Sequence, residues 1–163
     1  MNAKEAVKTA LQSTQHILNM YLSDLADEDL LVRPVPNANH IAWQLGHLIS
    51  SEVRMGGVTP GAAYPELPAG FAEQHGKTSA ASDPPRGFRT KKDYLDLFNK
   101  VRGATLANLE RMPDADLDKP TPGEMAKFAP TVGALFVLTA NHTMMHAGQF
   151  TVVRRKLGKP VLF

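Results

Sequence analysis

Two histidines lie four residues apart in the stretch NHTMMHAGQ, residues 141–149, inside a run with the apolar pattern of a buried helix. Residues i and i+4 of a helix share one face about 6 Å apart, so His142 and His146 can bind one metal ion together. The HExxH zinc motif has this spacing, but Thr143 stands where that motif has its general-base glutamate. The alternative is a pair of hydrogen-bonded core histidines.

A third ligand is available from another segment. His47 lies in the middle of the helical stretch AWQLGHLISSE, beside its apolar stripe. His40 projects in nearly the same direction but lies about 10.5 Å away along the axis, so we expect it at the mouth of the site or on the surface, where it could contact a substrate. His75, in a long loop, is expected to be solvated or to cover the site as a lid. His47 is therefore the candidate that joins His142 and His146.

Three histidines from two helices leave coordination positions open, which is typical of catalytic rather than structural metal sites. Imidazole ligands suit zinc, nickel, copper or iron. Thr139 and Gln149 follow the same seam and could hydrogen-bond to the ligands or to a water on the metal. The simpler alternative is that both bond to nearby backbone. Trp43, four residues before His47, is expected either to wall the pocket or to pack in the core.

The helices that must position these residues are visible as apolar spacings of three and four. They cover residues 3–26, 39–55, 90–112 and 131–157. Asn39 can cap the second segment, and Thr90 with Asp93 can cap the third. The fourth is apolar on flanking positions such as Met145 and Val152, which predicts burial on most sides. No strand alternation or repeat is visible, so the sequence predicts one all-α domain over residues 1–163, a four-helix bundle.

Two long connections shape the predicted bundle. Residues 56–89 hold six of the twelve glycines and five of the twelve prolines and have little periodicity. Long loops in compact domains are often functional, and a long crossover can join two parallel helices of a bundle. We therefore expect the second and third helices to run parallel and this loop to roof the site. Residues 113–130 are expected to hold no more than one short helical turn.

Composition narrows the function classes. The 163 residues are 43% hydrophobic and 21% charged, with a net charge of +2, which indicates a soluble globular protein without a polyanionic partner. Arg154, Arg155 and Lys156 are read as partners of a helix dipole rather than as a nucleic-acid stripe. The absence of cysteine excludes protein thiol catalysis and disulfides. No apolar run predicts a membrane span or signal peptide, and we expect a cytoplasmic location.

Two patterns in this sequence resemble the DinB-like superfamily, over essentially the whole chain in the order of elements. One is W-x-x-G-H, built from Trp43, Gly46 and His47, and the other is H-x-x-x-H-x-G-Q. The second pattern is formed by His142, His146, Gly148 and Gln149, followed by Arg154 and Gly158. The resemblance implies a four-helix bundle with a long crossover. It also implies that His47, His142 and His146 are metal ligands, in agreement with their spacing.

The resemblance also implies a range of chemistry. Some relatives are metal-dependent transferases or isomerases that use low-molecular-weight thiols such as bacillithiol or mycothiol. In these, the metal would lower the pKa of the thiol, so the protein needs no cysteine of its own. Family analogy further favours a homodimer. No feature of the sequence selects a particular thiol or substrate.

Three hypotheses remain open from the sequence. The first is an enzyme, a thiol-dependent transferase or hydrolase, in which a mononuclear divalent metal, zinc or nickel, activates a thiol or water against a small-molecule substrate. The second is a non-catalytic metal- or ligand-binding bundle. It is favoured by the lack of a clear acid or base, because Glu52 is turned about 140° from His47 and Glu73 lies in the loop. The third is a structural dimeric bundle with hydrogen-bonded buried histidines.

Overall fold

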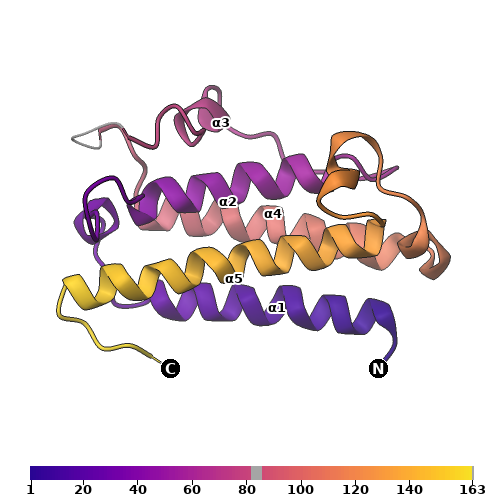
Figure 1. The fold of residues 1–163 in the computed structure, drawn as a ribbon, viewed down its shortest axis with the longest axis horizontal. Helices are drawn as coiled ribbons and strands as arrows, with labels where there is room; N and C mark the ends of the chain where they lie inside the picture. Colours follow the sequence, from indigo (N-terminus) through magenta and orange to yellow (C-terminus); the bar gives the residue numbers. More distant parts are fainter. Residues whose placement is uncertain (82–85, 163) are drawn as a thin grey trace.

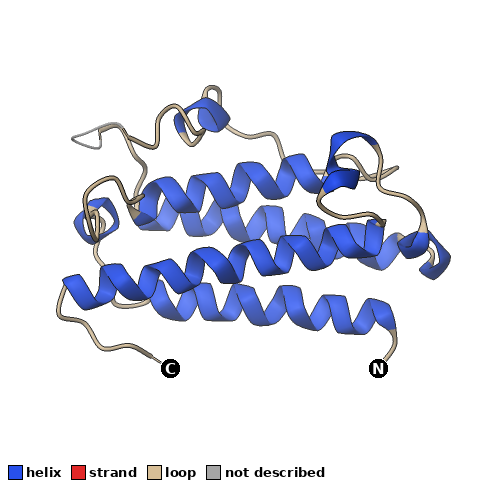
Figure 2. Cartoon of the chain, viewed as in Figure 1, coloured by secondary structure: helices blue, strands red, loops and turns tan. Residues whose placement is uncertain are grey.

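The computed structural model describes residues 1–81 and 86–162, and its core is four long helices lying alongside one another (Figures 1 and 2). These are α1 (Ala3–Leu22), α2 (Ile41–Gly56), α4 (Lys91–Arg111) and α5 (Val132–Lys156). The predicted all-α four-helix bundle is confirmed, and the described residues contain no strand beyond a single bridge between Pro120 and Thr131. None of the helices in this part of the chain combines the length and apolarity needed to span a bilayer.

The helix ends mostly follow the predicted caps. Thr90 caps α4, and the Asp93 side chain reaches back to the Thr90 backbone, which completes a capping box. The cap of α2 differs from the expectation, because His40 rather than Asn39 holds this position. The Nδ1 atom of His40 accepts a hydrogen bond from the backbone N–H of Trp43 at 3.2 Å. Because the cap lies one residue later than expected, the Nδ1 atom of His40 is used in a structural hydrogen bond.

Arg154, near the end of α5, ties this helix to the turn that follows α1. The helix α1 ends at Leu22, four residues before the predicted end, and a turn precedes the short 3-10 helix η1 (Glu28–Leu31). Asp24 in this turn pairs with Arg154, which is completely buried and also donates to the Tyr21 carbonyl at 2.8 Å. The hydrogen bond from Arg154 lowers the pKa of Asp24. Arg154, which we expected to act as a partner of the helix dipole, is therefore bound to Asp24 and to the Tyr21 carbonyl, whereas Arg155 is exposed.

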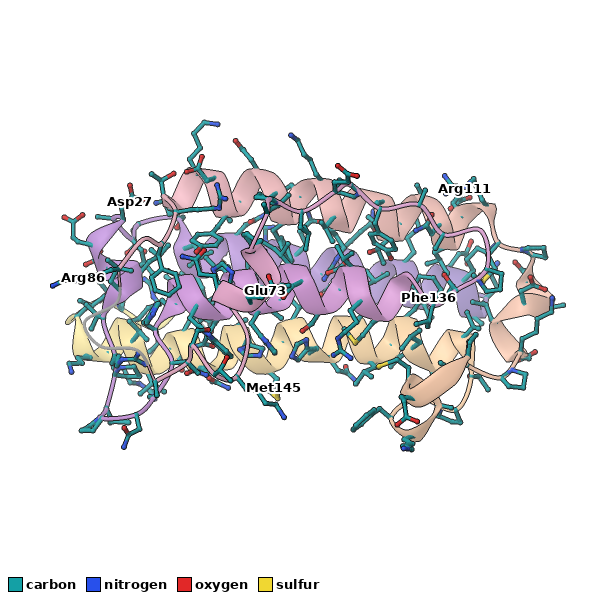
Figure 3. All side chains as sticks on the ribbon, turned by 90° about the horizontal axis from the view of Figure 1, so that it is seen from above. Asp27, Glu73, Arg86, Arg111, Phe136 and Met145 are labelled. Atoms are coloured by element: carbon teal, nitrogen blue, oxygen red, sulfur yellow. The ribbon has the colours of Figure 1, made fainter. Side chains whose placement is uncertain are left out.

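The helix α5 is buried on one side rather than most sides. Phe136 is buried, but Met145 and Val152 are 55% and 45% exposed. Figure 3 shows Met145 at the outer edge of α5, away from the other helices. The expectation of burial around most of this helix was wrong, because apolar residues on its outer face hid the one-sided pattern.

The crossover between α2 and α4 folds back over α2 and contains a short helix, α3 (Phe71–Gln74) (Figure 1). Hydrogen bonds attach the crossover to both of these helices. The indole Nε1 of Trp43 on α2 donates to the Gly76 carbonyl and to Ser79 Oγ, each at 3.2 Å. Tyr64 Oη lies 3.1 Å from Thr105 Oγ1 on α4. The shorter connection before α5 holds two 3-10 helices, η2 (Asp114–Asp118) and η3 (Gly123–Lys127), rather than one turn.

An ion pair lies in the interior of the bundle. Arg102 of α4 is completely buried, and Glu52 of α2 is 2% exposed. The guanidinium donates two parallel hydrogen bonds of 2.8 Å, from Nε to Oε1 and from Nη2 to Oε2 of Glu52. Thr105 also donates to Glu52 Oε1, at 2.6 Å. Glu52, which the sequence placed off the histidine face, is therefore committed to Arg102.

The same guanidinium contacts the other two long helices. Its Nη1 donates to the Leu11 carbonyl of α1 at 2.6 Å and to Thr14 Oγ1 at 3.2 Å, and its Nη2 donates to Thr143 Oγ1 of α5 at 2.9 Å. A buried charge is tolerated only when such partners replace water. Arg102 therefore links all four helices at one level of the bundle.

We expect Glu52→Gln to destabilise the protein by about 3 kcal/mol, because removing one partner leaves the charge of Arg102 buried and uncompensated. Unfolding in urea, followed by circular dichroism, measures this. The double variant Glu52→Leu/Arg102→Met should lose less unfolding free energy than the two single variants lose together. As a control, Lys92→Met breaks an exposed pair with Asp96 and should leave the midpoint unchanged. If Glu52→Gln and Lys92→Met each caused only a small and similar loss of unfolding free energy, the role given to Arg102 would be contradicted.

Candidate metal centre

The structure brings His47, His142 and His146 together. One ring nitrogen from each lies within 4.8 Å of the other two. The ring of His47 on α2 lies 5.2 Å from that of His142 and 5.4 Å from that of His146, between centroids. The i,i+4 pair on α5 converges more closely, with 3.2 Å between the two Nε2 atoms. Among the described residues, these three histidines form the one cluster of histidine or carboxylate side chains whose geometry suits a metal ion.

Gln44 sets the orientation of one of these imidazoles. His146 Nδ1 lies 2.8 Å from Gln44 Oε1, and the amide nitrogen of Gln44 donates to the Asn39 carbonyl at 2.8 Å. Because the amide nitrogen is used by Asn39, Gln44 presents its oxygen to His146 and accepts the Nδ1 proton. The Nε2 atom of His146 then carries the lone pair and faces the cluster. Such a partner commonly fixes the tautomer of a metal-binding histidine.

The cluster holds its histidines in the neutral form. Burial, together with the neighbouring rings, lowers the pKa of His142 to about 4 and that of His146 to about 3. Burial also lowers the pKa of His47, opposed by a hydrogen bond to the His75 backbone. Neutral imidazole is the form that binds metals, so at neutral pH these ligands need to lose no proton.

The donor set fits a divalent transition metal. Zinc–imidazole bonds of about 2.0–2.1 Å in a tetrahedral site place two ligand nitrogens roughly 3.3 Å apart, close to the 3.2 Å between His142 and His146. His142 Nδ1 is buried and has no hydrogen-bond partner among the described residues, whereas its Nε2 atom is the one that faces His146.

Trp43 forms one wall of the cluster. Its ring stacks on His47 with the planes 8° apart and the centroids separated by 4.8 Å. The indole is 4% exposed, and its N–H is held by Gly76 and Ser79 of the crossover. Both sequence interpretations of Trp43 therefore apply, since it is a core residue that also contacts a site residue.

Gly46 allows the crossover to approach α2 closely. His75 of the crossover is completely buried, and a Cβ atom at Gly46 would collide with its ring. His75 Nδ1 lies 2.7 Å from the Phe71 carbonyl, and Nε2 lies 2.7 Å from Tyr94 Oη on α4. Burial raises the pKa of Tyr94 to about 12 and lowers that of His75. The expectation of a solvated histidine was wrong, because His75 is buried and ties the crossover to α2 and α4.

The other residues proposed from the sequence lie elsewhere. His40 is 1% exposed and packs edge-on against Phe88 at 4.5 Å between centroids, so the surface placement was wrong. Thr139 donates to the Leu135 carbonyl at 3.0 Å, as in the simpler alternative. Gln149 is exposed. Glu73 is exposed on α3, which lies over α2 in Figure 3.

Gln44 is the site residue that the sequence reasoning missed. Its position three residues before His47 puts it on the same side of α2, which was an available signal. The partner across the bundle, His146, is 102 residues away, and no local pattern indicates that contact.

A four-helix bundle with three histidines converging from two helices defines the structural class. The chain belongs to the DinB superfamily, whose family model matches residues 10–150. No functionally curated protein matches the chain in sequence.

Solved structures share the fold at low sequence identity. YfiT from Bacillus subtilis, described as a probable metal-dependent hydrolase with an unusual four-helix bundle topology, matches with a TM-score of 0.67 and 18% identity, over 96% of this chain and 89% of YfiT. A conserved protein from Enterococcus faecalis matches with a TM-score of 0.67 and 13% identity, over 98% and 99% of the two chains. At these identities, the comparisons show the fold.

We expect Gly46→Ala to destabilise the protein by about 2 kcal/mol, because the added methyl group collides with His75. Gly148→Ala is a matched control on α5, since no described residue lies within 4 Å of a Cβ there and alanine favours helices by up to about 1 kcal/mol. Urea unfolding measures both. Removing the ring in Gly46→Ala/His75→Ala should abolish the additional cost of the alanine. A stabilising Gly46→Ala would show that the crossover does not need this close approach.

We expect the metal-free protein to lose stability as the pH falls from 7 to 5. The folded-state pKa values of His142 and His146 lie below the ordinary 6.5, so the unfolded chain binds more protons in this window. Each histidine should account for roughly 1–2 kcal/mol, measured by urea unfolding in the presence of a chelator. His142→Asn should reduce the loss of stability between pH 7 and pH 5 by the contribution of one histidine. A dependence identical to that of the parent protein would argue against a neutral buried His142.

Proposed function

We propose that this protein is a metal-dependent enzyme whose mononuclear centre is held by His47, His142 and His146. The observation that supports this most directly is the convergence of three neutral imidazoles, one with its tautomer set by Gln44. The description of the structurally similar YfiT as a probable metal-dependent hydrolase points the same way. Zinc or nickel suits a set of imidazole donors.

The metal, when bound, would lower the pKa of a water or thiol and so supply a nucleophile at neutral pH. The protein's own residues hold and orient the centre. Gln44 keeps the proton on Nδ1 of His146, and Trp43 covers one face of His47. Three protein ligands leave positions for the nucleophile and a small-molecule substrate.

The lack of a carboxylate beside the histidines, in the part of the chain that the structure describes, narrows the range of reactions that the site could catalyse. Within the described residues, no aspartate or glutamate joins the cluster, and Glu52 is bound to Arg102. A nucleophile whose own pKa is lowered needs no separate general base. We therefore propose transfer or hydrolysis that starts from an already ionised nucleophile, a low-molecular-weight thiol or water. A non-catalytic metal-binding bundle is the second candidate, favoured by the same absence.

Elemental analysis of protein purified without an affinity tag should find about one metal ion per chain. We expect His142→Ala and His146→Ala to abolish binding and His47→Ala to weaken it strongly, since two ligands on one helix remain. Gln44→Leu should keep the stoichiometry at saturating metal but lower the affinity by roughly 10–100-fold, because it removes the partner that orients His146. His16→Ala changes an exposed histidine of α1 and is the control.

The metal-loaded protein should also unfold at a higher temperature than the metal-free protein, since binding to the folded state alone adds to its stability. No metal in the parent protein, even after reconstitution with zinc and nickel, would refute the proposal. Metal binding without turnover of any thiol-transfer or hydrolytic substrate would favour the non-catalytic alternative.

A further inference from the structure

Arg54 lies on the side of α2 that carries His47. It follows His47 by seven residues, two helical turns, which places it in nearly the same direction about 10.5 Å along the axis. Arg54 is exposed, and its Nη1 donates to Met125 Sδ at 3.5 Å. Thioether sulfur is a weak acceptor, so this contact does not compensate the charge. Arg54 forms no ion pair with any residue that the structure describes.

Lys77 lies on the crossover, in the segment that contacts Trp43. It follows Gly76, whose carbonyl accepts the indole N–H of Trp43, and Trp43 stacks on His47. Lys77 is exposed, and among residues 1–81 and 86–162 it has no ion-pair partner. Glu73, four residues earlier on α3, is exposed and does not pair with it. The fields of Arg54 and Lys77 both lower the pKa of His47, and that of Arg54 also lowers the pKa of His142.

Position, rather than the lack of an ion pair, distinguishes Arg54 and Lys77, because Lys100 and Arg155 are also exposed and have no ion-pair partner among the described residues. Several exposed cations pair with acidic neighbours, namely Lys8 with Glu110, Lys92 with Asp96, Lys119 with Asp116 and Lys127 with Glu124. Beside the histidine cluster, two cations stand without such partners. A divalent metal held by three neutral ligands would add two further positive charges. Like charges in one partly buried region repel, and an anion from solution would relieve that repulsion.

We propose that the histidine cluster, in which His47 and His142 are only half-buried, binds an organic oxyanion. In this proposal Arg54 pairs with the carboxylate or phosphate group of the oxyanion, and Lys77 adds a second positive charge. The inference rests on the proposed metal site and names the substrate class of that site. The planar guanidinium can donate two parallel hydrogen bonds to an oxyanion, which selects orientation as well as charge. The other end of the molecule then reaches the histidines.

The test compares two probes that differ in one charge. Protein loaded with Co²⁺ is titrated with 3-mercaptopropionate and with its neutral amide, 3-mercaptopropionamide, and binding is followed by the visible absorption of cobalt. We expect the carboxylate to bind at least tenfold more tightly than the amide. Arg54→Met should reduce this ratio to near one, and Arg54→Lys should retain part of it. Arg155→Met removes an exposed cation at the end of α5 and should leave the ratio unchanged.

The outcomes separate the two proposals. If the parent protein takes up no Co²⁺, the metal site itself is refuted, and this inference fails with it. If Co²⁺ binds but the two probes have equal affinity, or neither binds, only the oxyanion site is refuted. Unchanged cobalt absorption and thermal midpoint in metal-loaded Arg54→Met would show that a lost preference does not come from a damaged fold. A preference that survives in Arg54→Met would also refute the assignment.

Discussion

The buried charge of Arg102 constrains the rest of the bundle. Its guanidinium must be satisfied, and the groups that satisfy it come from all four long helices, with Glu52 as the counter-charge. One of them, Thr143, lies between His142 and His146 on α5. The hydrogen bond to Thr143 therefore holds the rotation of α5 that turns its histidines toward α2. A polar core of this kind stabilises one arrangement of helices where an apolar core would tolerate several.

The histidine cluster depends equally on the crossover. His75 fills the space that Gly46 leaves open, and its ring bonds to Tyr94, so the crossover is attached to α2 and α4 at the level of the site. This attachment brings Gly76 within reach of Trp43, which in turn stacks on His47. The W-x-x-G-H pattern is thus one structural unit, in which the tryptophan and the glycine support the histidine between helix and crossover.

The electrostatics of the site follow from what surrounds it. Burial keeps the histidines neutral, and the cations Arg54 and Lys77 favour the neutral form of His47 further. The one carboxylate close in sequence, Glu52, is withdrawn into the core by Arg102. A site with neutral donors and no carboxylate among its described members has little capacity to move protons by itself, but its imidazoles can hold a cation. The proposed metal-dependent chemistry relies on this capacity.

The sequence by itself determined the helices, the bundle class and the i,i+4 histidine pair, because helical spacing and capping are local properties that each segment carries alone. It also identified His47 by its mid-helix position. Tertiary structure decided the roles of Gln44, His75 and Arg102, whose partners lie on other segments of the chain. Burial of a polar or charged side chain depends on whether distant groups replace its water, and no local pattern contains that information.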